Sequence, residues 1–109
     1  MISVTIFENQ EEQITRFHCI GHADYAEPGS DIICAGVSVL VYNAINSIEL
    51  FSDSLFELEM EEKSGLIDFA FLNDSDENAQ LLLRSMILGL QGIQEDYGDK
   101  YIVLEFKEV

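Results

Sequence analysis

Hydrophobic and polar residues alternate in five short stretches, which is typical of strands that bury one face. These predicted strands cover residues 2–6, 14–20, 56–61, 67–71 and 102–106. Two longer stretches repeat hydrophobic residues at intervals of three and four, which predicts amphipathic helices. The first runs from Asp31 to about Ser52, and the second begins after a cap at Asp74 or Ser75 and ends near Tyr97-Gly98.

The order of these elements is strand, strand, helix, strand, strand, helix, strand. Because nearly every strand offers one apolar face, two helices are expected to cover that face. The prediction is an α+β two-layer sandwich with a mostly antiparallel five-stranded sheet, in which the first two strands form a hairpin. The 109 residues suffice for a single domain that spans residues 1–109.

Charge narrows the partners that the chain is expected to bind. Twenty-one acidic residues against five basic ones give a formal net charge of −16. Such a charge repels nucleic-acid phosphates and attracts basic proteins, so direct nucleic-acid binding is not expected. The alternative is an acidic surface that serves solubility alone.

The start of the sequence, MISVTIFENQ, has neither the basic first residues nor the cleavage site of a signal peptide. No apolar run is expected to approach the ~20 residues that a membrane span needs. We therefore expect a soluble cytoplasmic protein with no membrane contact, whose two cysteines stay as thiols.

The stretch from Gly21 to Ser38, GHADYAEPGSDIICAGVS, contains the candidate chemistry. It passes from a strand end through a loop into a helix. Asp31 is the predicted N-cap, which makes Cys34 the third helical residue, where free N–H groups and the helix dipole favour a thiolate. His22 could then act as general base and acid. The alternative is that Cys34 is a small buried residue and Asp31 an ordinary cap.

Gly21-His22-Ala23, the Pro28-Gly29 loop and the run Asp31 to Ser38 resemble the signature of the ribosomal-processing cysteine protease family. The likeness in length and element order covers essentially all 109 residues. It implies a catalytic dyad of Cys34 and His22. The family signature also contains the residues that correspond to Gly21, Ala23 and Ser38, which are therefore supporting candidates. Gly36 departs from the pattern, because the family commonly has a second alanine there.

The resemblance implies an endopeptidase that removes a short N-terminal extension from a large-subunit ribosomal protein, without a cofactor. It also suggests a homodimer, and Leu81, Leu88, Gly89 and Gly92 form a candidate contact patch on the second helix. Asp31 could orient His22 as a third catalytic member, although capping alone explains this residue.

Two other functions remain open. One is a non-catalytic acidic adaptor that binds basic ribosomal proteins. The other is a metal site formed by His22, Cys34 and either Asp24 or Asp31. Only two strong ligands converge in that arrangement, whereas zinc sites use three or four protein ligands, so no metal is expected.

Overall fold

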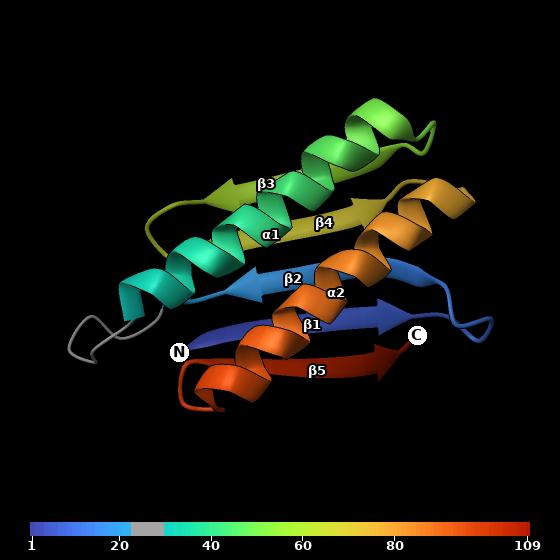
Figure 1. Cartoon of the computed structure of the whole chain (residues 1–109). Helices are drawn as coiled ribbons and strands as arrows, with labels where there is room; N and C mark the ends of the chain where they lie inside the picture. The colour runs from blue at the N-terminus through green and yellow to red at the C-terminus, as the bar shows by residue number, and fades with distance from the viewer. Residues whose placement is uncertain (23–29) are drawn as a thin grey trace.

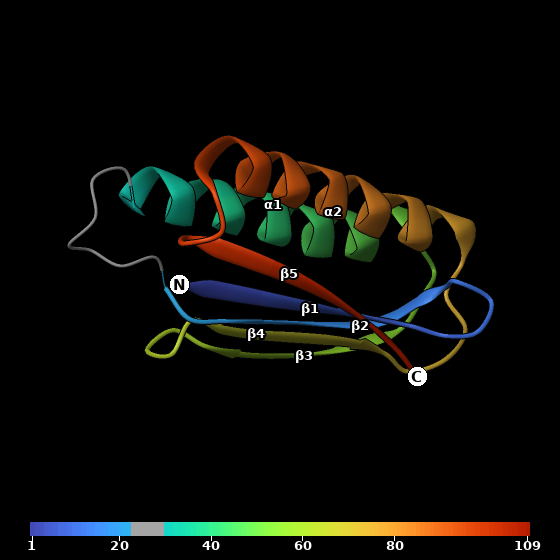
Figure 2. The ribbon, with the colours of Figure 1, turned by 90° about the horizontal axis from the view of Figure 1, so that it is seen from below.

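The computed structural model describes residues 1–22 and 30–109, with the backbone alone at residues 30 and 31. In this part of the chain, two helices lie side by side on one face of a five-stranded sheet (Figures 1 and 2). The elements in chain order are β1 Ile2–Glu8, β2 Ile14–Ile20, α1 Ser30–Phe51, β3 Phe56–Glu61, β4 Leu66–Phe71, α2 Glu77–Tyr97 and β5 Ile102–Glu108. The predicted α+β sandwich and its element order are confirmed.

The strands follow the order β3-β4-β2-β1-β5 across the sheet. Neighbouring strands are antiparallel, including the predicted β1–β2 hairpin, except that β1 and β5 run parallel from Ile2 opposite Ile102 to Glu8 opposite Glu108. The sheet is therefore mostly antiparallel, as predicted. Because β2 and β4 are antiparallel neighbours, the last residues of β2 and the first residues of β4 lie at the same end of the sheet.

The hydrophobic core lies between the sheet and the helices, and the inward-facing strand residues form one side of it. Phe69 on β4 is at its centre and is fully buried. Its ring stacks on Phe17 and Phe56, with centroid distances of 5.1 and 4.6 Å, and meets Phe71 edge-on at 5.0 Å. Aromatic contacts of this kind add to the free energy gained by burial alone.

Helix α1 is long and apolar enough to cross a membrane by length and composition, over Ile32–Phe51 with a mean hydropathy of 1.5. The expectation that no apolar run approaches this length is therefore wrong. One stripe of the helix, including Val41 and Ile48, is fully buried in the core, while Val39 and Leu50 on other sides are exposed. The core helix of a globular domain meets the same criterion, and the buried stripe gives α1 that role here.

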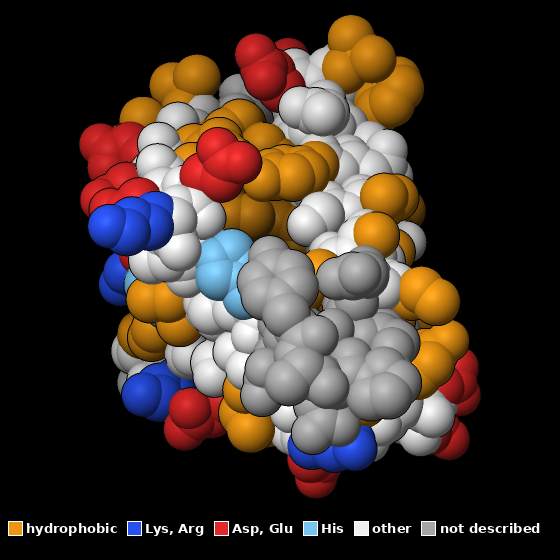
Figure 3. Space-filling view, turned by 90° about the vertical axis from the view of Figure 1, so that its left-hand side faces the viewer, with side chains coloured by type: hydrophobic (Ala, Val, Ile, Leu, Met, Phe, Trp, Pro, Cys, Tyr) orange, Lys and Arg blue, Asp and Glu red, His pale blue; other side chains and the backbone are white. Residues whose placement is uncertain are grey.

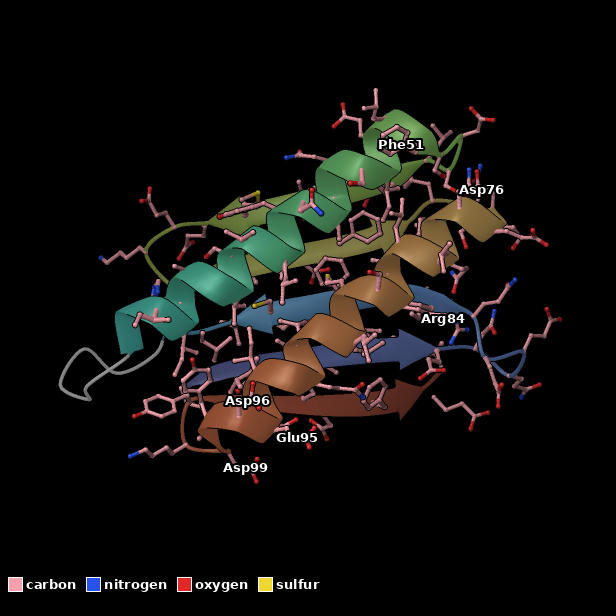
Figure 4. All side chains as sticks on the ribbon, in the orientation of Figure 1. Phe51, Asp76, Arg84, Glu95, Asp96 and Asp99 are labelled. Atoms are coloured by element: carbon pink, nitrogen blue, oxygen red, sulfur yellow. The ribbon has the colours of Figure 1, made fainter. Side chains whose placement is uncertain are left out.

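The N-cap of α2 is Asp76, and the prediction of Asp74 or Ser75 is wrong by one or two residues. The Asp76 carboxylate accepts hydrogen bonds from the Ala79 N–H at 2.9 Å and the Ser52 hydroxyl at 2.8 Å. These bonds lower the pKa of Asp76 to about 2. Figure 4 shows Asp76 where α2 begins, close to Phe51 at the end of α1. The cap therefore also ties the two helices together.

The two helices approach closely at Gly89 of α2. A side chain there would come within 2.8 Å of Leu40 on α1, so this glycine belongs to the helix–helix contact. Its predicted place in an outward patch is therefore wrong. Leu81 and Leu88 do point outward, with 67% and 71% of their surfaces exposed.

Candidate active site

Gly21 and His22 follow directly after β2 and lie at the end of the sheet where β4 begins. Gly21 has a φ of +97°, and a side chain there would overlap the carbonyl oxygen of Met1. Its N–H donates to the carbonyl of Ser64 at 2.9 Å, and the nitrogen of Met1 donates to the carbonyl of His22 at 2.6 Å. Glycine is needed here because the chain must turn sharply next to another backbone segment.

The backbone of α1 places Cys34 differently from the prediction. The helix begins at Ser30, so Asp31 lies inside the helix and is not its N-cap. The backbone is already helical at Ser30, one residue before the predicted cap. Cys34 is consequently the fifth residue of the helix, and the free N–H groups that favour an anion belong to the turn before it.

His22, Cys34 and Ser38 all line one cleft of about 490 Å³, together with Gly21. The structure thus brings together four of the six predicted site residues. The cleft opens at the end of the molecule where α1 begins. In the space-filling view from that end, hydrophobic side chains gather beside a histidine, with acidic side chains next to them (Figure 3).

Several residues of the cleft were not predicted. Its apolar wall includes Tyr42 from α1 and Met60 from β3, and its acidic side comes from Glu61 and Glu62. The alternation along β3 had indicated only a core face and a solvated face. Gly65 also lines the cleft, and the sequence could have indicated this turn as part of the site, because a glycine in a hairpin turn often marks a close approach of two backbones.

The imidazole of His22 is held by the turn between β3 and β4. Its Nε2 lies 3.1 Å from the carbonyl oxygen of Lys63. A carbonyl oxygen can only accept a hydrogen bond, so Nε2 must carry the proton. His18, the other histidine, faces the opposite side of the sheet, where its Nδ1 lies 2.9 Å from Asp68. Its neighbour Cys19 points the other way and is buried in the core, as expected for successive residues of a strand.

The two cysteines differ in their surroundings. Cys19 is buried and desolvation raises the pKa of its thiol to about 11, whereas Cys34 is half-buried in the cleft. Because only a thiolate reacts with alkylating reagents, we expect iodoacetamide at neutral pH to modify Cys34 and leave Cys19 unmodified. Mass spectrometry of the folded protein and of Cys34→Ser measures this. Labelling of folded Cys34→Ser at neutral pH would contradict the prediction.

Ala23 and the side chain of Asp31, the two remaining site candidates, lie outside the described residues, as does Asp24. A role for Asp31 in orienting His22 therefore stays a prediction. Among the side chains that the structure describes, no three of His, Cys, Asp or Glu gather so as to hold a metal ion.

Comparison with known proteins identifies the family. Residues 1–102 match the sequence model of the family described as cysteine protease Prp. The ribosomal processing cysteine protease Prp of Bacillus subtilis is 36% identical over 103 residues, which cover 91% of this chain and 92% of that protein.

Two crystal structures of the essential ribosomal processing protease Prp from S. aureus have the same fold. The complex with a covalently linked product peptide is 33% identical with a TM-score of 0.89, and the complex with a substrate peptide is 32% identical with a TM-score of 0.84. Each comparison covers 98% of this chain and 100% of that one. The chain therefore belongs to the cysteine protease Prp family.

Proposed function

We propose that this chain is a cysteine endopeptidase in which Cys34 is the nucleophile and His22 the general base and acid. The observation that carries this proposal is that both side chains line one cleft, although they come from different elements. A nucleophile and a base within one cleft are the minimum that covalent catalysis requires. The apolar wall beside them offers a surface for a peptide substrate.

The proposed reaction transfers the Cys34 thiol proton to His22, and the thiolate attacks the scissile carbonyl carbon. Backbone N–H groups at the start of α1 stabilise the oxyanion that forms. The imidazolium then gives its proton to the departing amine, which leaves a thioester on Cys34. Water, deprotonated by His22, hydrolyses the thioester and restores the free thiol. Ser38, one turn after Cys34 in the cleft, supports the bound peptide.

The proposed substrate is the precursor of a large-subunit ribosomal protein, from which the enzyme removes a short N-terminal extension. Relatives named ribosomal processing cysteine proteases, and a related structure with a substrate peptide, support this substrate class. A net charge of −16 favours encounter with a basic protein. We place this activity in the cytoplasm and propose neither nucleic acid nor membrane as a direct partner.

We also propose that the enzyme acts as a homodimer. Leu81 and Leu88 on α2 expose most of their surfaces, and a second copy of the chain is the occupant that would cover them. Sedimentation equilibrium should give the mass of two chains, and Leu88→Glu should lower it toward one. The mass of one chain for the unaltered protein at all concentrations would contradict the dimer.

The proposed function is tested by incubating the protein with such a precursor and weighing the products by mass spectrometry. Two fragments are expected, whose masses sum to that of the precursor plus one water. A matched precursor with proline after the scissile bond is a suitable control, because it should remain intact. Binding of the precursor without cleavage would contradict the proposal and favour a non-catalytic adaptor.

A further inference from the structure

We propose that the turn between β3 and β4, residues 62–65, is a positioning element for His22. This inference rests on the proposed function and adds a third component to the Cys–His pair. The backbone carbonyl of Lys63 holds the neutral imidazole with its proton on Nε2, so that Nδ1 is the nitrogen that takes the thiol proton. The group that performs this role is a backbone carbonyl.

The turn holds both residues at the end of β2. The Lys63 carbonyl accepts from the His22 ring at 3.1 Å, and the neighbouring Ser64 carbonyl accepts from the Gly21 N–H at 2.9 Å. The turn is itself closed by a hydrogen bond from the Gly65 N–H to the Glu62 carbonyl at 3.2 Å. Two successive carbonyls of one closed turn thus position the histidine ring and the backbone that carries it.

Gly65 is what allows the turn to come this close. Its φ is +70°, and a side chain there would overlap the Gly21 carbonyl oxygen and lie 3.1 Å from Cε1 of His22. Any other residue would face both a strained backbone and a collision with the segment that holds the histidine. The identity of this residue is therefore tied to the position of His22.

The arrangement has a direct chemical consequence. A neutral imidazole has one N–H donor and one acceptor nitrogen, so a hydrogen bond that fixes the donor also fixes the acceptor. When the thiol proton reaches Nδ1, the ring becomes cationic and its bond to the Lys63 carbonyl becomes charge-assisted and stronger. The carbonyl thereby stabilises the imidazolium that forms during attack, the task that a third residue performs in other nucleophile–histidine sites.

Nuclear magnetic resonance of nitrogen-15-labelled histidine tests this in the complete protein. In the neutral form of its ring, His22 should be the Nε2–H tautomer. His18 is an internal control that should show the other tautomer, since its Nδ1 faces the Asp68 carboxylate and should carry the proton. An Nδ1–H tautomer for His22 would overturn the proposal, and this measurement does not depend on any variant folding.

The matched variants are Gly65→Ala and Gly98→Ala. Both glycines have positive φ, +70° and +92°, but a side chain at Gly98 would meet nothing within 4 Å. Both variants should therefore carry backbone strain, and only Gly65→Ala should disturb His22. We expect Gly65→Ala to lower kcat about a hundredfold relative to Gly98→Ala with a smaller change in KM, because small displacements of a catalytic group have effects of this size.

The pH profile of kcat/KM should also change in Gly65→Ala and stay as in the unaltered protein in Gly98→Ala. A folded Gly65→Ala variant with the kcat and pH profile of Gly98→Ala would overturn the role of the turn. If Cys34→Ala abolishes cleavage while His22 is the Nδ1–H tautomer, the positioning proposal fails and the proposed function stands. If the unaltered protein leaves the precursor intact, the proposed function itself fails.

Discussion

Replacing Cys34 by alanine is expected to lower kcat/KM for the ribosomal precursor by about a thousandfold or more, because the acyl-enzyme can no longer form. The half-buried thiol lies in the cleft and not in the centre of the core, so the variant should fold. Thermal unfolding followed by circular dichroism verifies that, and quantitative mass spectrometry of the products measures the rate. Cleavage at the unaltered rate by Cys34→Ala would remove this residue from the mechanism.

A second variant, His22→Ala, tests whether His22 and Cys34 act in the same step. Residues that act as a unit show strongly non-additive effects, since removal of either one already blocks the shared step. The double variant should therefore be about as slow as Cys34→Ala alone. A double variant that is slower by the product of the two single effects would show that the residues act independently, which contradicts a dyad.

Replacing Phe69 by alanine is expected to lower the free energy of unfolding by about 3–5 kcal/mol, the usual cost of removing a buried phenylalanine. The ring is fully buried and contacts three other phenylalanines. Since a domain of this kind has about 5–15 kcal/mol of stability in total, the loss is a large fraction of it. Urea unfolding, with the midpoint and slope fitted together, measures the change.

Phe106 provides the matched control, because 47% of its surface is exposed at the edge strand β5. Phe106→Ala should cost less than half as much as Phe69→Ala, since less apolar surface returns to water. Equal losses for the two variants would mean that the aromatic cluster around Phe69 is not the centre of the stabilising core.

Hydrophobic periodicity was sufficient to predict the elements and layers of this fold, because burial on one face leaves its period in the sequence. It did not indicate that β5 pairs with β1 in parallel, since alternation says which face is buried and not which strand lies beside it. Helix caps were uncertain for a related reason. Asp74, Ser75 and Asp76 are all residue types that cap helices well, and the folded backbone is extended at Asp76 and directs its carboxylate to the Ala79 N–H.

The candidate site was predicted where its chemistry depends on side chains. His22, Cys34 and Ser38 were predicted mainly because they match the signature of a known family, and the cleft contains all three. The Lys63 carbonyl could not be found in that way, because every residue has a carbonyl and only the folded turn directs this one at the imidazole. Met60 was interpreted as part of the buried face of its strand, and Tyr42 was not singled out, since apolar cleft walls and core share one pattern.

The parallel pairing of β1 with β5 has a consequence for synthesis of the protein. Strand β1 leaves the ribosome well before β5, with which it pairs along its whole length, from Ile2 with Ile102 to Glu8 with Glu108. Until that final segment emerges, one edge of β1 has no partner and is open to pairing with other chains. A nascent chain that stalls or is truncated before residue 102 should therefore be prone to aggregation, even though the proposed catalytic residues, His22 and Cys34, have already been translated.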